Sequence, residues 1–137
     1  MTTLSSLYIE KILRDAKTIA VVGVSAKPEK DSFRVMQFLL DHGYNVFPVN
    51  PAYKEILGLK CYGSLQEIPD LIDIVDIFRR SEDVKPIVDD AIAVKAKTVW
   101  MQLGIINEEA ASAATNAGMN VIMNKCIKIE YASLVAR

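Results

Sequence analysis

Residues 20–28 read AVVGVSAKP, and this stretch decides the fold. Together with residues 18–19 it begins as an almost unbroken apolar run, which is expected of a central parallel strand covered by helices on both faces. Gly23 allows a tight exit from that strand. The Gly-x-Gly-x-x-Gly spacing of a dinucleotide-binding loop is missing, because residues 24–28 contain no glycine. The stretch therefore predicts a strand, a loop and a helix start that differ from an ordinary dinucleotide site.

Strands and helices alternate along the rest of the chain. Helical periodicity and capping signals predict helices over residues 4–16, 31–43, 81–96, 107–118 and 129–137, and a short one over 64–67. Runs of β-forming apolar residues predict strands over 18–24, 44–49, 73–78, 97–104 and 120–124. This order indicates an α/β fold, a Rossmann-like three-layer domain with a mostly parallel sheet of about five strands and helices on both faces. Residues 1–137 are expected to form a single domain.

Single residues refine the expected boundaries. Ser81 and Asn107 are expected to cap helices, and Gly43 and Gly118 to end them. Pro48 lies inside the second predicted strand, where it cannot donate a ladder hydrogen bond. We therefore expect that strand to be irregular or to lie at the margin of the sheet.

Composition excludes several classes of protein. The formal net charge of −1 gives no overall field that would attract nucleic acid, and apolar runs of four or five residues are far too short to span a membrane. The first residues lack the basic start and apolar segment of a secretory signal. The two cysteines have neither metal-ligand nor disulfide-framework spacing. Reduced thiols and a cytoplasmic location are expected, with no metal.

Ligands of such sheets bind beyond the carboxyl ends of the strands, near the point where strand order reverses. This rule selects five segments before any chemistry is considered. They are the loop after Val24, Asn50-Pro51 after the second strand, Arg79-Arg80 after the third, Leu103-Gly104 after the fourth and residues 124–126 after the fifth.

The first of these segments has the chemistry of an anion site. Backbone amides near Ser25, and the positive end of the following helix, can face a phosphate. Ser25 and Ser32 add hydroxyl groups, and three cations follow within eight residues, namely Lys27, Lys30 and Arg34. Two acidic residues lie among them, so by charge alone a solvated loop of mixed charge is an equally compatible interpretation.

The end of the second predicted strand speaks against NAD. Folds that bind nicotinamide dinucleotides usually place an Asp or Glu there to accept hydrogen bonds from the adenosine ribose. Residues 48–51 read PVNP and contain no carboxylate. A ribose that carries a 3′-phosphate would tolerate this absence, because a carboxylate would repel it. Asn50-Pro51 is also a turn-forming pair, and the two roles are compatible.

These segments together resemble a known family. VVGVSAKPEKDSFRVMQFLLDHGYNVFPVNP (21–51), DIVDIFRR (73–80), WMQLGI (100–105) and NKC (124–126) are similar to the small stand-alone CoA-binding proteins. That family is similar in turn to the N-terminal CoA-binding domain of succinyl-CoA synthetase α-subunits and of NDP-forming acyl-CoA synthetases. The resemblance runs roughly over residues 12–130, and it implies coenzyme A or an acyl-CoA as the ligand.

The resemblance also implies a set of contact residues. In the family, the loop after the first strand cradles the CoA diphosphate, the VNP motif borders adenine and ribose, and the next strand ends line the nucleotide and the pantetheine. Carried over, these are Gly23, Val24, Ser25, Lys27, Pro28, Lys30, Ser32 and Arg34, then Val49, Asn50 and Pro51, and finally Phe78, Arg79, Arg80, Gln102, Leu103 and Gly104.

Catalytic residues are not evident. The single histidine, His42, is expected to be a helix C-terminal residue, and the synthetases carry their phosphorylated histidine in a separate domain. Asp73 and Asp76 lie at odd spacing on one strand, so they are expected to face opposite sides. Asp89 and Asp90 are expected on a solvated helix surface. Enzyme activity is therefore left open and is the less favoured interpretation.

Three functional hypotheses remain. The first is a non-catalytic CoA or acyl-CoA binding or regulatory module. The second is an enzyme that uses Cys126 in thiol–disulfide or thioester exchange with CoA, against the alternative of a half-buried structural cysteine. The third is an NAD(P)-binding redox module. A protein partner or a homo-oligomer is compatible with each of them.

Overall fold

Five parallel strands form one sheet in a computed structural model, which describes residues 3–136. The sheet order is β2 (Asn45–Val49), β1 (Thr18–Val22), β5 (Ile74–Ile77), β6 (Thr98–Met101) and β7 (Asn120–Ile122). All neighbouring strands in it are parallel, with β2 and β5 on opposite sides of β1. The strand order therefore reverses between β1 and β5. This arrangement confirms the α/β, Rossmann-like expectation.

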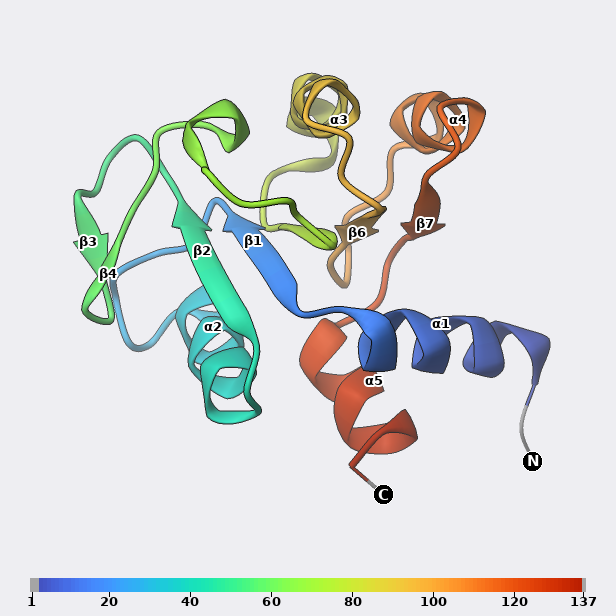
Figure 1. The fold of residues 1–137 in the computed structure, drawn as a ribbon, viewed down its shortest axis with the longest axis horizontal. Helices are drawn as coiled ribbons and strands as arrows, with labels where there is room; N and C mark the ends of the chain where they lie inside the picture. Colours follow the sequence, from blue (N-terminus) through green and yellow to red (C-terminus); the bar gives the residue numbers. More distant parts are fainter. Residues whose placement is uncertain (1–2, 137) are drawn as a thin grey trace.

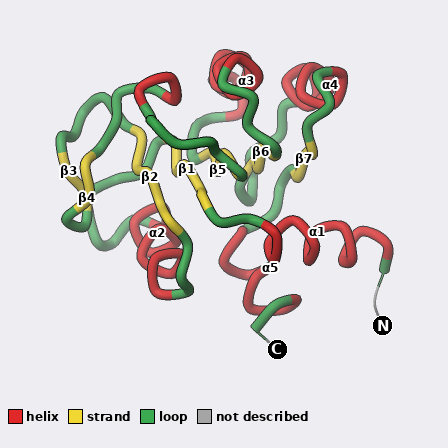
Figure 2. The backbone as a smooth tube through the Cα atoms, in the orientation of Figure 1, coloured by secondary structure: helices red, strands yellow, loops and turns green. Residues whose placement is uncertain are grey.

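Helices cover both faces of the sheet (Figure 1; Figure 2). One layer holds α1 (Leu4–Asp15), α2 (Asp31–Asp41) and α5 (Ile127–Leu134). The other holds α3 (Val84–Ala93) and α4 (Glu108–Asn116), with short 3-10 turns η1 (Leu65–Glu67) and η2 (Ser81–Asp83). Among the described residues no helix is long and apolar enough to cross a membrane.

The apolar core is split by the sheet into two clusters. Alternate strand residues face the two helix layers, so that Val21, Ile74 and Trp100 pack toward α1, α2 and α5, while Val75 and Met101 pack toward α3 and α4. Trp100 has no exposed surface. Because strands β1, β5 and β6 are buried on both faces, their sequences are apolar except for Thr18, Asp76 and Thr98, which explains why they could be located from sequence.

Several expected boundaries are confirmed. The side chain of Asn107 accepts a hydrogen bond from the amide of Ala110 at 2.9 Å and so caps α4. Gly43 and Gly118 lie just beyond helix ends with positive φ angles of 89° and 86°. Pro48 lies on β2, an edge strand of the sheet, where the missing amide hydrogen costs little.

Two local expectations were wrong, and one local element was not predicted. Ser81 does not cap α3, because the turn η2 comes first and the Ser81 hydroxyl instead accepts a hydrogen bond from the amide of Ile106 at 3.0 Å. The last helix begins at Ile127, two residues early. A hairpin of β3 (Glu55–Ile56) and β4 (Leu59–Lys60) was not foreseen. Its turn residues Leu57 and Gly58 both have positive φ, a geometry that Leu rarely signals.

Candidate functional site at the carboxyl ends of the strands

Gly23 lies where the strand order reverses. Its amide donates to the carbonyl oxygen of Val49 at 2.9 Å, so the chain leaves β1 against the end of β2. On the other side, a Cβ atom at position 23 would overlap the carbonyl oxygen of Phe78 and lie 3.1 Å from Nε of Arg79. The φ angle of Gly23 is +86°. Only a glycine therefore allows the ends of β1, β2 and β5 to approach this closely.

The loop after β1 is held by its own serines. The hydroxyl of Ser32, which is buried, accepts a hydrogen bond from the amide of Ser25 at 2.9 Å. The hydroxyl of Ser25 accepts one from the amide of Lys27 at 3.0 Å. The Ser25 amide therefore has a partner inside the loop, where the sequence suggested that it faces an anion. Each hydroxyl keeps its own proton for a further hydrogen bond.

The five predicted cations differ in their engagement. Arg34 is ion-paired with Asp31 at 2.5 Å and donates to the carbonyl oxygen of Glu29. Arg80 is paired with Asp83 at 3.0 Å and with Glu82. Among the described residues no ion pair involves the other three, which are Lys27, Lys30 and Arg79.

Two cavities lie at this end of the sheet. The first, here called the β2-side cavity, has a volume of about 210 Å³ and is lined by Val49 and Pro51 from the end of β2, by Ser64 and by Arg79. The second, the α5-side cavity, has a volume of about 380 Å³. Its walls come from α2, α5 and the ends of β5 and β6, and its lining includes Arg34, Val35, Phe78, Gln102, Leu103, Ile105, Cys126, Lys128 and Ile129.

Gln102 has one committed and one uncommitted group. Its side chain is 4% exposed and lines the α5-side cavity. Its Oε1 accepts a hydrogen bond from the amide of Ile127 at 3.0 Å, which satisfies a free donor at the start of α5. That bond fixes which way the amide is turned, and the Nε2 donor has no partner among the described residues.

The loops at the mouth of the sheet brace one another. Nδ2 of Asn50 donates to the carbonyl oxygen of Val24 at 3.0 Å, which ties the loop after β2 to the loop after β1. The amide of Gly104 donates to Oδ1 of Asn124 at 2.7 Å, and Nε1 of Trp100 donates to the carbonyl oxygen of Lys125 at 2.8 Å. Hydrogen bonds within the protein therefore connect the loops that surround the site.

Replacement of Asn50 tests this bracing. Besides its bond to Val24, Asn50 accepts a hydrogen bond from the amide of Ala52 at 2.9 Å. We expect Asn50→Ala to lower the free energy of unfolding by about 1–3 kcal/mol, since both partners lose a hydrogen bond in a half-buried setting. Urea unfolding followed by circular dichroism measures this.

Asn45 provides a matched control at the opposite end of the same strand. It is exposed, and its side chain makes no hydrogen bond among the described residues. Asn45→Ala should change the free energy of unfolding by less than about 0.5 kcal/mol. Equal losses for the two substitutions would contradict a bracing role for Asn50.

Asp76 lies in the core beneath this site. Its side chain has no exposed surface, and neither carboxyl oxygen has a hydrogen-bond partner among the described residues. Asp76 is in register with Val21 and Trp100, so it faces the α1, α2 and α5 layer. Burial raises the pKa of this carboxyl well above its ordinary value. Phe78 is two residues further along, which puts Asp76 one layer below the floor of the α5-side cavity.

The other predicted acidic residues are engaged elsewhere. Asp73 accepts hydrogen bonds from the amides of Lys17 and Thr18 at 2.7 and 3.1 Å, and these bonds, with Lys97, lower its pKa against the opposing effect of burial. Asp89 is paired with Lys85 at 2.9 Å and Asp90 accepts from Gln66 at 2.9 Å. In residues 3–136 no cluster of three His, Cys, Asp or Glu side chains could hold a metal.

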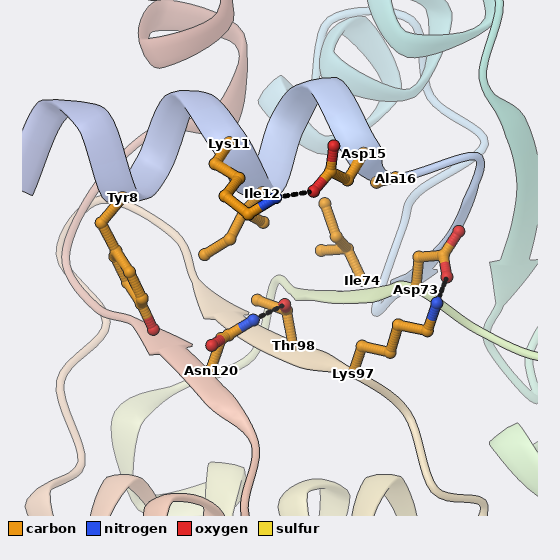
Figure 3. Close-up of a pocket in the computed structure, with 10 residues that line it drawn as sticks. All are labelled: Tyr8, Lys11, Ile12, Asp15, Ala16, Asp73, Ile74, Lys97, Thr98 and Asn120. Atoms are coloured by element: carbon orange, nitrogen blue, oxygen red, sulfur yellow. Dashed lines mark hydrogen bonds and ion pairs between the residues drawn. The ribbon is translucent and has the colours of Figure 1, made fainter.

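A further cavity of about 320 Å³ lies at the opposite end of the sheet, where the strands begin, beneath α1 (Figure 3). Its cations already have partners: Lys11 is paired with Asp15 at 2.7 Å and Lys97 with Asp73 at 3.4 Å. It contains none of the segments that the strand-end rule selects.

His42 also lies away from the strand ends, as the C-cap of α2. There it stacks on Phe38, and its Nδ1 is 2.7 Å from the Phe38 carbonyl oxygen.

Some site residues were missed from sequence. Ile105, Lys128 and Ile129 line the α5-side cavity, and Ser64 and Ile87 line the β2-side cavity. Lys128 and Ile129 follow directly on the predicted NKC segment, so a helix expected to start at residue 127 would have pointed to them. Ser64 and Ile87 come from segments distant in sequence, and no local pattern marks them.

Comparisons with known proteins identify similar sequences and structures. A family model described as CoA binding domain matches residues 17–132. The uncharacterized protein YneT of Bacillus subtilis (strain 168) is 42% identical over 128 residues, which are 93% of this chain and 95% of that protein. A hypothetical protein from Pyrococcus horikoshii OT3 has a similar structure, with a TM-score of 0.94, 45% identity and coverage of 96% of this chain and 93% of that one.

Larger enzymes contain a related segment. The ADP-forming acetate–CoA ligase of Methanocaldococcus jannaschii is 36% identical over 70 residues, which are 51% of this chain and 10% of the enzyme. The similarity therefore extends over only about a tenth of that enzyme's length.

Proposed function

Since the chain belongs to the CoA-binding domain family, we propose that it binds coenzyme A or an acyl-CoA across the carboxyl ends of its strands, as a non-catalytic binding or regulatory module. The ligand's adenosine occupies the β2-side cavity beside Val49 and Pro51. Its phosphates lie over the loop after β1, and its pantetheine arm extends into the α5-side cavity.

One observation carries the proposal. The guanidinium of Arg79 lies beside Gly23 at the switch point, on the lining of the β2-side cavity, and no hydrogen bond or ion pair engages it in residues 3–136. Lys27 and Lys30 on the adjoining loop form no ion pair within residues 3–136 either. An unpaired arginine beside a glycine that lets backbone and ligand approach closely, with two exposed lysines on the adjoining loop, is suited to the phosphates of CoA.

The end of β2 supports CoA over NAD. Asn50 follows β2 and commits both ends of its side chain to the backbone, at Val24 and Ala52. No carboxylate is among the residues that line the cavity at Val49 and Pro51 except Asp90, which accepts a hydrogen bond from Gln66. Asp90 keeps its negative charge, because Gln66 is neutral, but it comes from α3. The residues that directly follow β2, Asn50 and Pro51, carry no carboxylate.

A non-catalytic role agrees with the engagement of the chemical groups. The only histidine of the sequence is stacked on Phe38 at a helix end. Asp76 is buried in the core, Asp73 just before β5 accepts hydrogen bonds from backbone amides, and Asp89 and Asp90 of α3 are bound by Lys85 and Gln66. In this role the protein holds the ligand in one position, and a partner protein recognises the ligand-bound form.

Calorimetric titration under reducing conditions tests the ligand. We expect CoA to bind at least about tenfold more tightly than dephospho-CoA, because one charge-assisted hydrogen bond to the 3′-phosphate is worth about 1.5–3 kcal/mol. NAD and NADPH serve as further arms. Equal affinities for CoA and dephospho-CoA, or tighter binding of NADPH, would overturn the proposal.

Substitutions of two neighbouring arginines distinguish a specific contact with CoA from a general effect of net charge. Arg79→Gln should weaken CoA binding by about 10–100-fold, since it removes an unpaired cation at the switch point. Arg80→Gln removes the same charge one residue away, where Asp83 and Glu82 already neutralise it, and should change the affinity by less than about threefold. A similar loss in both variants would mean that only the long-range charge matters.

A further inference from the structure

We propose that Cys126 is a site of thiol–disulfide exchange with the CoA disulfide, so that the protein takes up one CoA unit covalently in the α5-side cavity. The inference rests on the proposed function and deepens it, because it states what happens at the thiol end of the ligand. Cys126 is half-buried, lines this cavity and is the N-cap residue of α5, which begins at Ile127.

Gln102 independently indicates a ligand in the same cavity. Gln102 is only 4% exposed. Its Oε1 accepts a hydrogen bond from the amide of Ile127, whereas its Nε2 donor has no hydrogen-bond partner among the described residues. A donor that lines a cavity without a partner in the protein is available to an acceptor on a bound molecule. The pantetheine arm carries two amide carbonyl groups of the required kind.

The walls of the cavity suit that arm. Val35, Phe78 and Ile129 give it an apolar lining. Lys128 adds a positive charge to the same lining, whereas the charge of Arg34 is paired with Asp31, which also lines the cavity. Ile127 connects the two polar features, because its amide is bound to Gln102 and it follows Cys126 in the chain. A carbonyl group of the ligand that accepts from Nε2 of Gln102 is thereby held close to the start of α5.

The second cysteine provides an internal control. Cys61 is buried, and its Sγ donates to the carbonyl oxygen of Asn50 at 3.4 Å. Burial raises the pKa of its thiol, which lowers the fraction of reactive thiolate. Cys61 lines neither cavity at the strand ends. The structure therefore distinguishes a ligand-facing cysteine from a structural one.

The exchange balances without an outside oxidant. The Cys126 thiolate attacks one sulfur of the CoA disulfide, the S–S bond of that disulfide breaks, and a protein–CoA disulfide forms. The second CoA leaves as a thiolate and takes up the proton that Cys126 gave to solvent. Free CoA or another thiol reverses the step by the same attack, so the modification reports the ratio of CoA disulfide to CoA.

Intact-mass spectrometry tests the inference. The reduced full-length protein is incubated with CoA disulfide and, in parallel, with glutathione disulfide, and peptide mapping locates the adduct. We expect one CoA unit on Cys126 and none on Cys61, formed about 100-fold faster than the glutathione adduct because the bound nucleotide raises the local concentration of the disulfide. Cys61→Ser should keep the adduct, and Cys126→Ala should lose it.

The outcomes separate the two proposals. CoA binding in the reducing titration together with no adduct on Cys126, or with equal labelling of both cysteines, overturns the exchange and leaves the binding function standing. Equal rates with CoA disulfide and glutathione disulfide also overturn it. Failure of CoA to bind in the titration overturns the proposed function itself, whatever the mass spectra contain.

Discussion

Gly23→Ala is expected to destabilise the fold by about 2–5 kcal/mol and to abolish measurable CoA binding. Two effects add. The φ angle of +86° costs a non-glycine residue about 1–2 kcal/mol, and the new methyl group would overlap the carbonyl oxygen of Phe78, a backbone atom that cannot rotate away. Relief of the overlap requires the ends of β1 and β5 to separate, and Arg79 moves with β5.

Gly43→Ala is the matched control. Gly43 has nearly the same φ angle, +89°, but a Cβ atom there meets nothing within 4 Å. It should cost only the conformational part, about 1–2 kcal/mol, and leave CoA affinity unchanged. The difference between the two variants measures the close approach at the switch point.

Chemical denaturation and calorimetric titration of both variants provide the measurement. Losses of stability that agree within experimental error would show that the approach of β1 to Phe78 is not tight. CoA affinity that survives in Gly23→Ala would argue against placing the phosphates over this loop.

The second large effect concerns Asp76 and pH. Because burial raises the pKa of this carboxyl, the folded protein holds its proton more tightly than the unfolded chain does. The stability associated with the protonated acid is complete below the ordinary pKa near 3.8 and is lost as the pH rises toward the raised pKa. Relative to Asp76→Asn, which cannot titrate, the wild type should lose about 1.4 kcal/mol of stability per pH unit over that interval.

Asp76→Val should be more stable than the wild type at neutral pH. It removes two carboxyl oxygens that have no partners and places a β-forming apolar side chain between Val21 and Trp100. Replacement of a buried charged or polar group by an apolar one commonly gains about 1–4 kcal/mol. Urea unfolding of all three proteins from pH 4 to pH 8 measures the effect.

Subtraction of the Asp76→Asn curve removes the contribution of Asp73, whose lowered pKa acts in the opposite direction at acid pH. A difference curve that stays flat with pH would contradict a raised pKa. CoA affinity should be measured in the same proteins. A stabilised Asp76→Val protein with weakened binding would show that the unpaired acid is kept for the ligand site above it.

The sequence by itself determined the order of the main elements and the end of the sheet that holds the site. Strands β1, β5 and β6 are buried on both faces, so their composition alone marks them, and Asn107, Gly43 and Gly118 mark helix ends through local hydrogen bonding and backbone geometry. The location of the site then follows from a rule about parallel strands. The strand composition and the helix-end signals depend on residues that are close together in the sequence.

Only the tertiary structure decided which of those residues are free. The sequence predicted five cationic residues for the site, of which Lys27, Lys30 and Arg79 form no ion pair in the described part of the chain. Asp76 resembled any other strand aspartate until both of its oxygens proved to have no partner, and Gln102 proved to be held at one end only. Arg34 and Arg80 are engaged by acidic residues two or three positions away, whereas the hydrogen bond of Gln102 joins residues 25 positions apart, a contact that local sequence patterns do not record. The complete burial of a side chain such as that of Asp76 results from the packing of the whole fold.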